Sequence, residues 1–467
     1  MIENISSIPK NTMITPDKKS DVSDNVPKSV NADTLPKSKV ETPTLVAYML
    51  KKNDNTNNVD VKFYNSISLN EMREKYGLIA KNTVQDLKNR AGQSGQVLNW
   101  INVLPNEQLK RIDEIYALAD SLKQNGTGKL GIIGIGGSKH TVENLLSLTG
   151  NKDKAVFLSS VDPNDIKDFV EKLGDKNTAA VLVASKSGTT LEPSVGFEAV
   201  QKLLGDDFKN YACITDKDEN KSKLRQLATN KGYKCGVIHD DCGGRFGAFD
   251  DHTLTALAYC GMSKDDMKKM LESSIKAQTK YLNSDITDNE ALQRAVFNTD
   301  TVLKGKNNQY DYYFGDKFDG TALWNTQLKK ESHKSLYKVS GDLVGPAFLH
   351  NSTESDLDKD NTTSFYTFNS IKNNGADEYK ALNALINGSL KAYSNVHPVS
   401  TVTLKDLSPD SIGQFIELKH FETIYTGMLL RQLKSADKTK AVQVSVLPEV
   451  EQPNVKTYKK EVEKILN

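Results

Sequence analysis

Short apolar runs alternate with amphipathic segments through the middle of the chain. The apolar runs are typical of buried strands and cover residues 130–135, 155–158, 179–184, 211–214 and 235–238. The segments between them have the spacing of amphipathic helices, at 165–173, 195–204 and 221–230. Because strands that are separated by helices usually pair in parallel, this rhythm predicts an α/β sheet with helices on both faces.

A long helical block at 263–303 separates this region from a second alternating region, which begins near Tyr310. We therefore expect two doubly wound parallel-sheet subdomains with flanking helices, over residues 129–290 and 291–467. The fold class that the pattern predicts is α/β.

The N-terminal part of the chain has a different pattern. Residues 1–43 are polar, repeat a Pro-Lys element and contain almost no aromatic side chains, so they predict a disordered tail. Residues 44–128 are predicted to be a helical segment. The apolar positions that recur there at helical spacing include Met72, Tyr76, Ile79 and Leu87.

Charge and cysteine content narrow the class of protein. The 61 Lys and Arg residues nearly cancel the 60 Asp and Glu residues, so no basic field is available to hold nucleic acid or a membrane surface. The four cysteines contain no C-x-x-C pair, which suits a reducing compartment. Neither an apolar run of the ~18 residues that span a membrane nor a secretory leader is visible. A cytoplasmic protein with a small-molecule partner is expected.

A glycine-rich loop follows the first predicted strand. Residues 134–138 read Gly-Ile-Gly-Gly-Ser and lead into a helix predicted to start near Val142. Such glycines let free N–H groups and a helix dipole approach an anion. A dinucleotide fingerprint would need glycine at Lys139, although Asp162 stands about where a ribose-binding acid would. The loop alone fits either a tight turn or an anion site.

A second loop favours phosphate. Residues 185–190 read Ser-Lys-Ser-Gly-Thr-Thr, directly after a predicted strand and before a helix that Pro193 helps to open. Four hydroxyls can donate hydrogen bonds, Lys186 neutralises charge, and the helix N-terminus favours an anion. Two such loops at neighbouring strand ends predict one ligand site at the edge of the sheet.

Three later clusters hold groups that could act on that ligand. Arg245 lies in a Gly-Gly-Arg-Phe stretch and carries a permanent charge that can stabilise an oxyanion. Gln327 and Glu331 are four residues apart on a predicted helix, so they share a face. Gln452 and Lys459 bracket the start of the last predicted helix. By itself each charged group could equally lie on a solvated helix face.

In sequence these motifs resemble the glucose-6-phosphate isomerase family, bacterial type, from about residue 99 to the C-terminus. Five family motifs occur in the family's order: Gly-Ile-Gly-Gly-Ser at 134, Ser-Lys-Ser-Gly-Thr-Thr-x-Glu-Pro at 185, Asp-x-Gly-Gly-Arg-Phe at 241, Gln-x-x-x-Glu-Ser at 327 and Gln-Pro-x-Val-x-x-Tyr-Lys at 452. Each motif is modestly specific, and their order makes the resemblance strong.

The resemblance implies roles for individual residues. Glu331 matches the catalytic base, Arg245 the arginine that stabilises the enediolate, and Lys459 the lysine that assists ring opening. The residues that match phosphate- or substrate-binding positions are Gly137, Ser138, Ser185, Lys186, Ser187, Thr190, Gln327 and Gln452. The resemblance also implies two SIS-type (sugar isomerase) subdomains, no cofactor or metal, and a homodimer.

The chain departs from the family pattern at several sites: residues 247–250 replace a Ser-rich stretch, Asn454 replaces a glycine of the last motif, and two further changes lie in catalytic motifs. The family's Glu-Ser-x-Gly-Lys has Lys334 in place of its glycine. The histidine that family members use for ring opening has no match, because Asp356 stands at the aligned position. His350, at the end of a strand predicted over 344–349, is the alternative partner of Lys459, and it could equally have no catalytic role.

The implied function is reversible isomerisation of D-glucose 6-phosphate and D-fructose 6-phosphate by ring opening and proton transfer through a cis-enediolate. Neither nucleic acid nor a membrane is an expected partner. A non-catalytic sugar-phosphate sensor would keep both anion loops and lose the chemistry. A nicotinamide-dependent dehydrogenase would explain the 134–138 loop but not the 185–190 loop.

Overall fold

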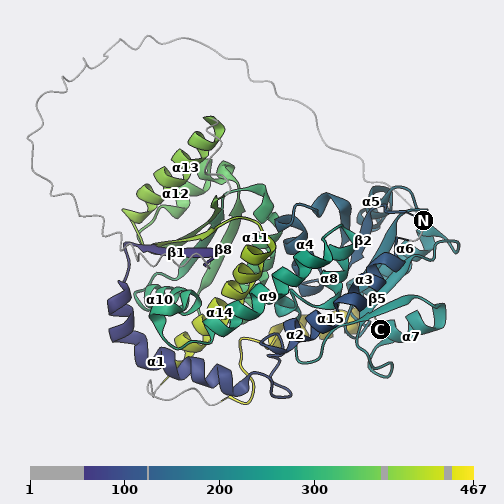
Figure 1. The fold of residues 1–467 in the computed structure, drawn as a ribbon, viewed down its shortest axis with the longest axis horizontal. Helices are drawn as coiled ribbons and strands as arrows, with labels where there is room; N and C mark the ends of the chain where they lie inside the picture. The colour runs from purple at the N-terminus through teal and green to yellow at the C-terminus, as the bar shows by residue number, and fades with distance from the viewer. Residues whose placement is uncertain (1–56, 124–125, 370–376, 436–443, 467) are drawn as a thin grey trace, which may run out of the picture. The chain divides into compact units, whose positions relative to one another are not determined.

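The computed structural model describes residues 57–123, 126–369, 377–435 and 444–466, so the tail predicted at 1–43 lies outside the described residues. A first sheet, which contains the strands labelled β2 and β5 in Figure 1, has five parallel strands in the order β3-β2-β4-β5-β6. They are β2 Leu130–Ile133, β3 Ala155–Leu158, β4 Ala180–Ala184, β5 Tyr211–Thr215 and β6 Lys234–Val237. The five strands overlap the five predicted runs, and the predicted parallel pairing is confirmed.

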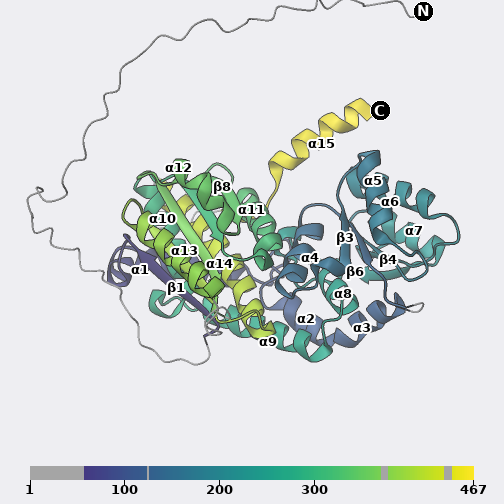
Figure 2. The same ribbon diagram turned by 90° about the horizontal axis from the view of Figure 1, so that it is seen from above.

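Alternate side chains of these strands point to opposite faces of the sheet, and both faces are covered. Ile133 and Val183 pack into the apolar cluster of α5, α6 and α7, whereas Ile132 and Leu182 pack into the cluster of α3, α4 and α8. Figure 2 shows these two groups of helices on opposite sides of the strands. The helices are α3 Ile112–Ser121, α4 Gly137–Leu148, α5 Pro163–Leu173, α6 Leu191–Leu204, α7 Lys223–Lys231 and α8 Asp251–Tyr259.

A second sheet also has five strands, in the order β1-β10-β9-β7-β8. They are β1 Val59–Tyr64, β7 Asn308–Tyr313, β8 Lys338–Val344, β9 Asn361–Phe368 and β10 Val399–Leu404. All neighbours pair in parallel except β1, which runs antiparallel to β10 at one edge. The second predicted parallel sheet is confirmed, with this one antiparallel strand added.

Strand β1 is a correction to the sequence prediction, which treated residues 44–128 as helical. Val59, Val61 and Phe63 alternate with polar residues, the period of a half-buried strand. This short run was overlooked because the longer helical pattern of α1 (Leu69–Arg90) follows it directly. α1 itself is confirmed: Ser68 and Glu71 form a capping box at its start, and its predicted apolar face is buried.

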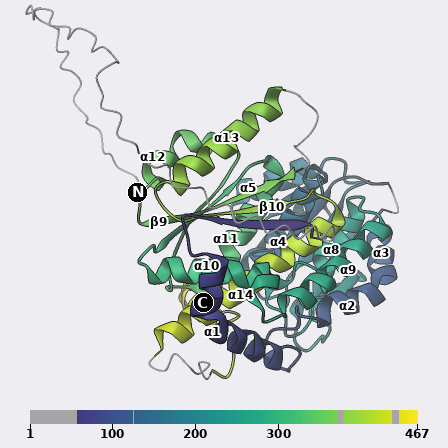
Figure 3. The same cartoon turned by 60° about the vertical axis from the view of Figure 1, so that its left-hand side comes forward.

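Helices cover both faces of the second sheet as well. Tyr312 and Phe365 pack against Tyr393 of α13, whereas Tyr313 and Tyr366 belong to the cluster that contains α10 and α14. In Figure 3, α13 lies on one side of β9 and β10, and α10 and α14 lie on the other. These helices are α10 Glu290–Leu303, α13 Asp377–Ser394 and α14 Pro409–Lys434.

Helix α11, which carries the predicted site residues Gln327 and Glu331, lies beside the first sheet. α11 (Asp319–His333) packs on α4, and a Cβ on Gly320 would lie 2.4 Å from the carbonyl oxygen of Glu143. Only glycine permits this approach, which brings α11 against the helix that follows the first glycine loop. The remaining helices are α2 Val103–Lys110, α9 Lys264–Tyr281, α12 Ser352–Asp356 and α15 Pro453–Leu466. In the part of the chain that the structure describes, none of the helices has the length and apolar character needed to cross a membrane.

Candidate functional site

The loops that follow β2, β4 and β6 carry three of the predicted motifs. Because these strands are parallel, the three loops lie at the same carboxyl edge of the first sheet. Open α/β sheets bind ligands at this edge. The loops after β2 and β6 lie in direct contact, since a Cβ on Gly137 would lie 2.1 Å from the carbonyl carbon of Gly244. Gly136 has φ +57°, and a Cβ there would lie 2.9 Å from Gln327 Nε2. Gly137 is therefore needed for the two backbones to meet, and Gly136 for its positive φ.

Helix α4 begins at Gly137, earlier than the start near Val142 that the sequence predicted. The helix starts inside the glycine motif because Gly136, its N-cap, adopts the positive φ with which the chain turns from β2 into α4. The amides of its first turn, including that of the half-buried Ser138, therefore stand at the loop itself. Asp162, considered above as a ribose-binding acid, caps α5 and accepts a hydrogen bond from Asn164 N at 2.8 Å.

The 185–190 loop is stabilised by its own hydroxyls. Ser185 Oγ accepts from Gly188 N at 3.2 Å, and Ser187 Oγ accepts from Thr189 N at 3.2 Å. Thr190 is the N-cap of α6, yet its side chain makes no capping hydrogen bond. The N-terminus of α6 therefore lies at the end of this loop, an arrangement that suits a bound phosphate.

Two lysines supply positive charge beside this loop. Lys186 Nζ donates to the carbonyl of His239 at 3.5 Å and lies 3.6 Å from a carboxylate oxygen of Asp240. Lys217 Nζ lies 3.4 Å from the same carboxylate. Partial burial tends to raise the pKa of Asp240, but the two lysines bring it below its usual value. Asp240 is thus the anion that lies between the two ammonium groups.

A single carboxylate is the centre of the second part of the site. Glu331 Oε1 accepts from Gln327 Nε2 at 2.8 Å, and Oε2 accepts from Arg245 Nη1 at 2.9 Å. Gln452 Nε2 also donates to Oε2. The Glu331 side chain is 22% exposed, so a ligand can reach it. The structure thus brings together four predicted residues: Arg245, Gln327, Glu331 and Gln452.

Arg245 is held rigidly because each guanidinium nitrogen has a partner. Its Nε donates to Ser332 Oγ at 3.0 Å, its Nη1 to Glu331, and its Nη2 to the carbonyl of Glu449. The side chain is 1% exposed. Burial lowers the pKa of Arg245, and the neighbouring Glu331 opposes that shift. A buried, fully bonded guanidinium is a preorganised partner for negative charge.

α11 explains why Gln327 and Glu331 point to one place. The two residues are one helical turn apart, as predicted, and the same helix buries Trp324 and Leu328 in the core. Trp324 Nε1 donates to the carbonyl of Arg245 at 2.9 Å. The helix is therefore attached to the arginine loop on one side, which fixes the distance between Glu331 and Arg245.

Sequence reasoning missed a buried group of charges behind α11. Lys329 pairs with Asp311 of β7, and Glu422 accepts from Arg294 at 2.8 Å and from Lys419 at 3.1 Å. Each of these side chains is at most 2% exposed, and burial lowers the pKa of Lys419 to about 8. The signal in the sequence was a set of charged residues inside elements that are otherwise suited to burial. Lys419 and Glu422 are three residues apart on α14, but Arg294 and Asp311 lie on other elements than their partners, so those pairings could not be predicted.

The turn at residues 447–452 (the 447–452 turn) brings Gln452 to Glu331. Leu447 and Val450 are buried in the main core, and Arg431 Nε donates to Glu449 Oε1 at 2.5 Å. Sequence reasoning assigned Gln452 through its motif and gave no role to the residues before it.

Two predicted catalytic residues are not joined to this group. In the described parts of the chain, no hydrogen bond or ion pair connects Lys459 or His350 with Glu331. His350 is exposed and ends the 3₁₀ helix Pro346–His350, because β8 stops at Val344, where the sequence had predicted a strand to begin. Asp356 is buried and accepts a hydrogen bond from Tyr312 Oη. That contact ties Asp356 to the core of the second sheet.

One cluster has the ligand types of a metal site. Single ligand atoms of His239, Asp250 and Asp251 lie within 4.8 Å of one another. However, Arg111 Nη1 lies 3.0 Å from Asp251 Oδ1 and 3.2 Å from His239 Nε2. The His239 ring also lies 2.6 Å from Asp250, which raises the pKa of His239 against the effect of burial. The guanidinium thus already neutralises the cluster, and a cation would be repelled.

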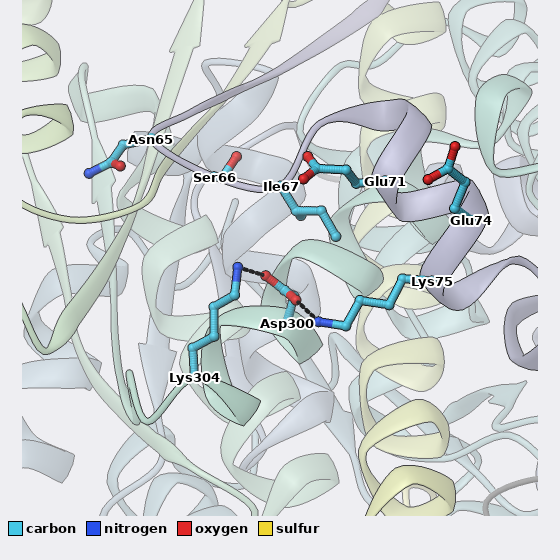
Figure 4. Close-up of a pocket in the computed structure, with 8 residues that line it drawn as sticks. All are labelled: Asn65, Ser66, Ile67, Glu71, Glu74, Lys75, Asp300 and Lys304. Atoms are coloured by element: carbon cyan, nitrogen blue, oxygen red, sulfur yellow. Dashed lines mark hydrogen bonds and ion pairs between the residues drawn. The ribbon is translucent and has the colours of Figure 1, made fainter.

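A separate hollow of about 540 Å³ lies between α1 and α10, and it contains none of the predicted site residues (Figure 4). Its floor is Asp300, whose carboxylate pairs with Lys75 at 2.9 Å and with Lys304 at 2.6 Å. The ion pair of Asp300 with Lys75 links α1 to α10 at the base of the hollow.

Comparison with known proteins agrees with the fold and the motifs. A structure of a hypothetical protein from Thermus thermophilus matches at a TM-score of 0.73 and 20% identity, over 87% of this chain and 100% of that one. A glucose-6-phosphate isomerase structure from Chlamydia trachomatis matches at a TM-score of 0.66 and 16% identity, over 88% of each chain. Two five-stranded sheets that are parallel except for β1, with helices on both faces, define an α/β protein of the sugar isomerase (SIS) fold.

The sequence comparisons find similarity to the phosphoglucose isomerases. Residues 127–333 match the family model of phosphoglucose isomerase. A glucose-6-phosphate isomerase of Caldanaerobacter subterraneus is 28% identical over 295 residues, 59% of this chain but only 64% of that protein. One from Mycoplasma capricolum is 25% identical over 441 residues, 88% of this chain and 98% of that protein. Over these ranges the chain is similar in sequence to bacterial phosphoglucose isomerases.

Proposed function

We propose that the protein interconverts D-glucose 6-phosphate and D-fructose 6-phosphate. The observation that carries this proposal is the Glu331 carboxylate, which is reachable by a ligand and held between Gln327, Gln452 and the buried Arg245. This group lies beside the 134–138 loop, in a chain related to phosphoglucose isomerases.

The proposed reaction moves one hydrogen between C1 and C2 of the open-chain sugar. Glu331 takes the proton from one carbon and returns it to the other, so no net oxidation occurs. The buried charge of Arg245, next to Glu331, stabilises the negative charge that develops on the oxygens of the enediolate. Gln327 and Gln452 orient the carboxylate, and the distant phosphate contributes binding energy that aligns the reacting carbons.

A coupled assay from fructose 6-phosphate to glucose 6-phosphate tests the proposal directly. Turnover that needs no added metal or nucleotide in the isomerisation step supports it. The alternative is a non-catalytic sensor, which would bind fructose 6-phosphate with a measurable Kd and release it unchanged. Binding without turnover would therefore overturn the enzymatic proposal.

Phosphate binding is assigned to the 185–190 loop with Lys186 and Ser187, and to Gly137 and Ser138 of the first loop. Replacing both Ser185 and Thr190 by alanine should weaken fructose 6-phosphate binding, because each charge-assisted hydrogen bond contributes about 1.5–3 kcal/mol. Titration calorimetry with inorganic phosphate and with the sugar phosphate measures the loss.

Thr189→Ala is the matched control, since its hydroxyl is already paired with Ser187 Oγ at 2.8 Å. The control should retain the affinity of the unaltered protein. An unchanged Kd in the double variant would mean that the loop has only a structural role.

Ring opening is assigned to Lys459, with His350 as its partner. Lys459→Ala should lower total turnover by about 10²-fold, the lower end of general acid–base effects, while proton exchange on an open-chain analogue survives. Lys460→Ala, one residue along the same helix, is the control and should keep full turnover. If His350→Ala keeps full turnover, Asp356 or solvent performs the transfer and the assignment of His350 is wrong.

We further propose a cytoplasmic homodimer, as the resemblance to phosphoglucose isomerases implies. The lack of a bond between His350 or Lys459 and Glu331 within one chain fits a site that a second copy completes. Sedimentation of the purified protein would reveal the dimer.

A further inference from the structure

The end of α11 has a backbone conformation that does not suit its residue. Lys334 follows His333 as the C-cap and has φ +53° and ψ −119°. A side chain crowds the backbone in this region, which glycine occupies freely. Such a conformation persists where contacts of the side chain compensate for it.

The contact that Lys334 makes is with the 447–452 turn. Its half-buried Nζ donates to the carbonyl of Pro448, and the next carbonyl, that of Glu449, accepts from Arg245 Nη2. Two cations from the surroundings of Glu331 thus hold two successive carbonyls of the same turn. Burial and the nearby Arg245 lower the pKa of Lys334.

The turn itself is compact and leads directly to the site. Val450 N donates to the carbonyl of Leu447 at 3.0 Å, and Glu451 N donates to that of Pro448 at 3.3 Å. Gln452 follows at once and donates to Glu331. Lys334 therefore holds the start of the 447–452 turn, and Gln452 at the end of the turn contacts the Glu331 carboxylate.

We propose that Lys334 is a positioning residue, which fixes the 447–452 turn to the end of α11 and so holds Gln452 against Glu331. This inference rests on the proposed function for its catalytic consequence. Its structural part, that Lys334 holds the turn, is independent of any activity.

The test is Lys334→Gly, which relieves the backbone and removes the side chain at the same time. The thermal midpoint should stay equal or rise, because glycine suits the positive φ. Amide hydrogens of Val450 and Glu451 should exchange roughly tenfold faster, and kcat should fall roughly tenfold while KM changes little, since a misplaced orienting group impairs catalysis more than phosphate binding. Lys334→Arg, which keeps a cation of similar reach, should restore both.

Asn102→Gly is the control, because Asn102 also has a positive φ (+60°) and its side chain makes no capping bond. It should leave exchange at Val450 and Glu451 and kcat unchanged. Unchanged amide exchange in Lys334→Gly would overturn the proposal, and so would equal losses in Lys334→Gly and Lys334→Arg. If the unaltered protein has no isomerase activity, the proposed function fails, and the exchange measurement alone decides the role of Lys334.

Discussion

Glu331→Gln is expected to abolish proton transfer at C2 while the protein still binds fructose 6-phosphate within a few-fold of the normal Kd. The amide keeps the size of the side chain and can still contact Gln327 and Gln452, but it cannot accept the proton. General-base assistance of this kind contributes about 10²–10⁴-fold in rate. Incorporation of deuterium from heavy water into the product measures the step directly.

Two controls separate chemistry from folding in this variant. Glu331→Asp keeps a carboxylate at a shorter reach and should retain measurable exchange. Calorimetric binding of the sugar phosphate to Glu331→Gln shows whether the site is still formed. Normal deuterium exchange in Glu331→Gln would assign the base to another residue.

Asp311→Asn is expected to cost about 3–5 kcal/mol of unfolding free energy, the range found when one partner of a buried ion pair is removed. The change leaves Lys329, Lys419 and Arg294 with Glu422 as their only buried counter-ion among the described residues. Urea denaturation followed by circular dichroism measures the loss. Asp319→Asn is the matched control, since it removes a partly exposed pair with Lys152 and should cost at most about 1 kcal/mol.

The pH dependence of stability is a second test of the buried ion pair of Asp311. Burial alone would raise the pKa of this carboxyl, but Lys329, Lys419 and Arg294 bring it below its ordinary value of 3.8. A carboxyl whose pKa is lower in the folded state contributes stability above its unfolded pKa and loses it as the pH falls. The unaltered protein should therefore lose stability below about pH 4, and Asp311→Asn should lose less over the same range. Equal slopes for the two proteins would contradict the buried pair.

The sequence predicted best those features that depend on residues close together in the chain. The strands of the first sheet, the shared helix face of Gln327 and Glu331, and the loop at 185–190 follow from period, capping and composition. That Glu331 and Arg245 belong to one site followed only from the family resemblance, since the two residues are far apart in the chain. Spacing alone cannot place side chains that tertiary packing brings together.

The predictions that failed depended on short elements or on loop conformation. β1 is a six-residue strand whose pairing partner, β10, lies far along the chain. His350 was placed at a strand end, but the chain leaves β8 earlier and forms a 3₁₀ helix at Pro346. The pairs Arg294–Glu422 and Lys329–Asp311 join separate elements. For β1 and for these two pairs the decisive interaction is non-local.

The antiparallel pairing of β1 with β10 has a consequence for the solution behaviour of the protein. An unpaired outer strand presents a row of free N–H and C=O groups on which another chain can add as an extra strand. Residues Val59–Tyr64 occupy that row on β10. A chain shortened past Tyr64 would therefore expose β10 as a template for self-association, even with every residue around Glu331 intact. Solubility would then depend on six residues that take no part in the proposed chemistry.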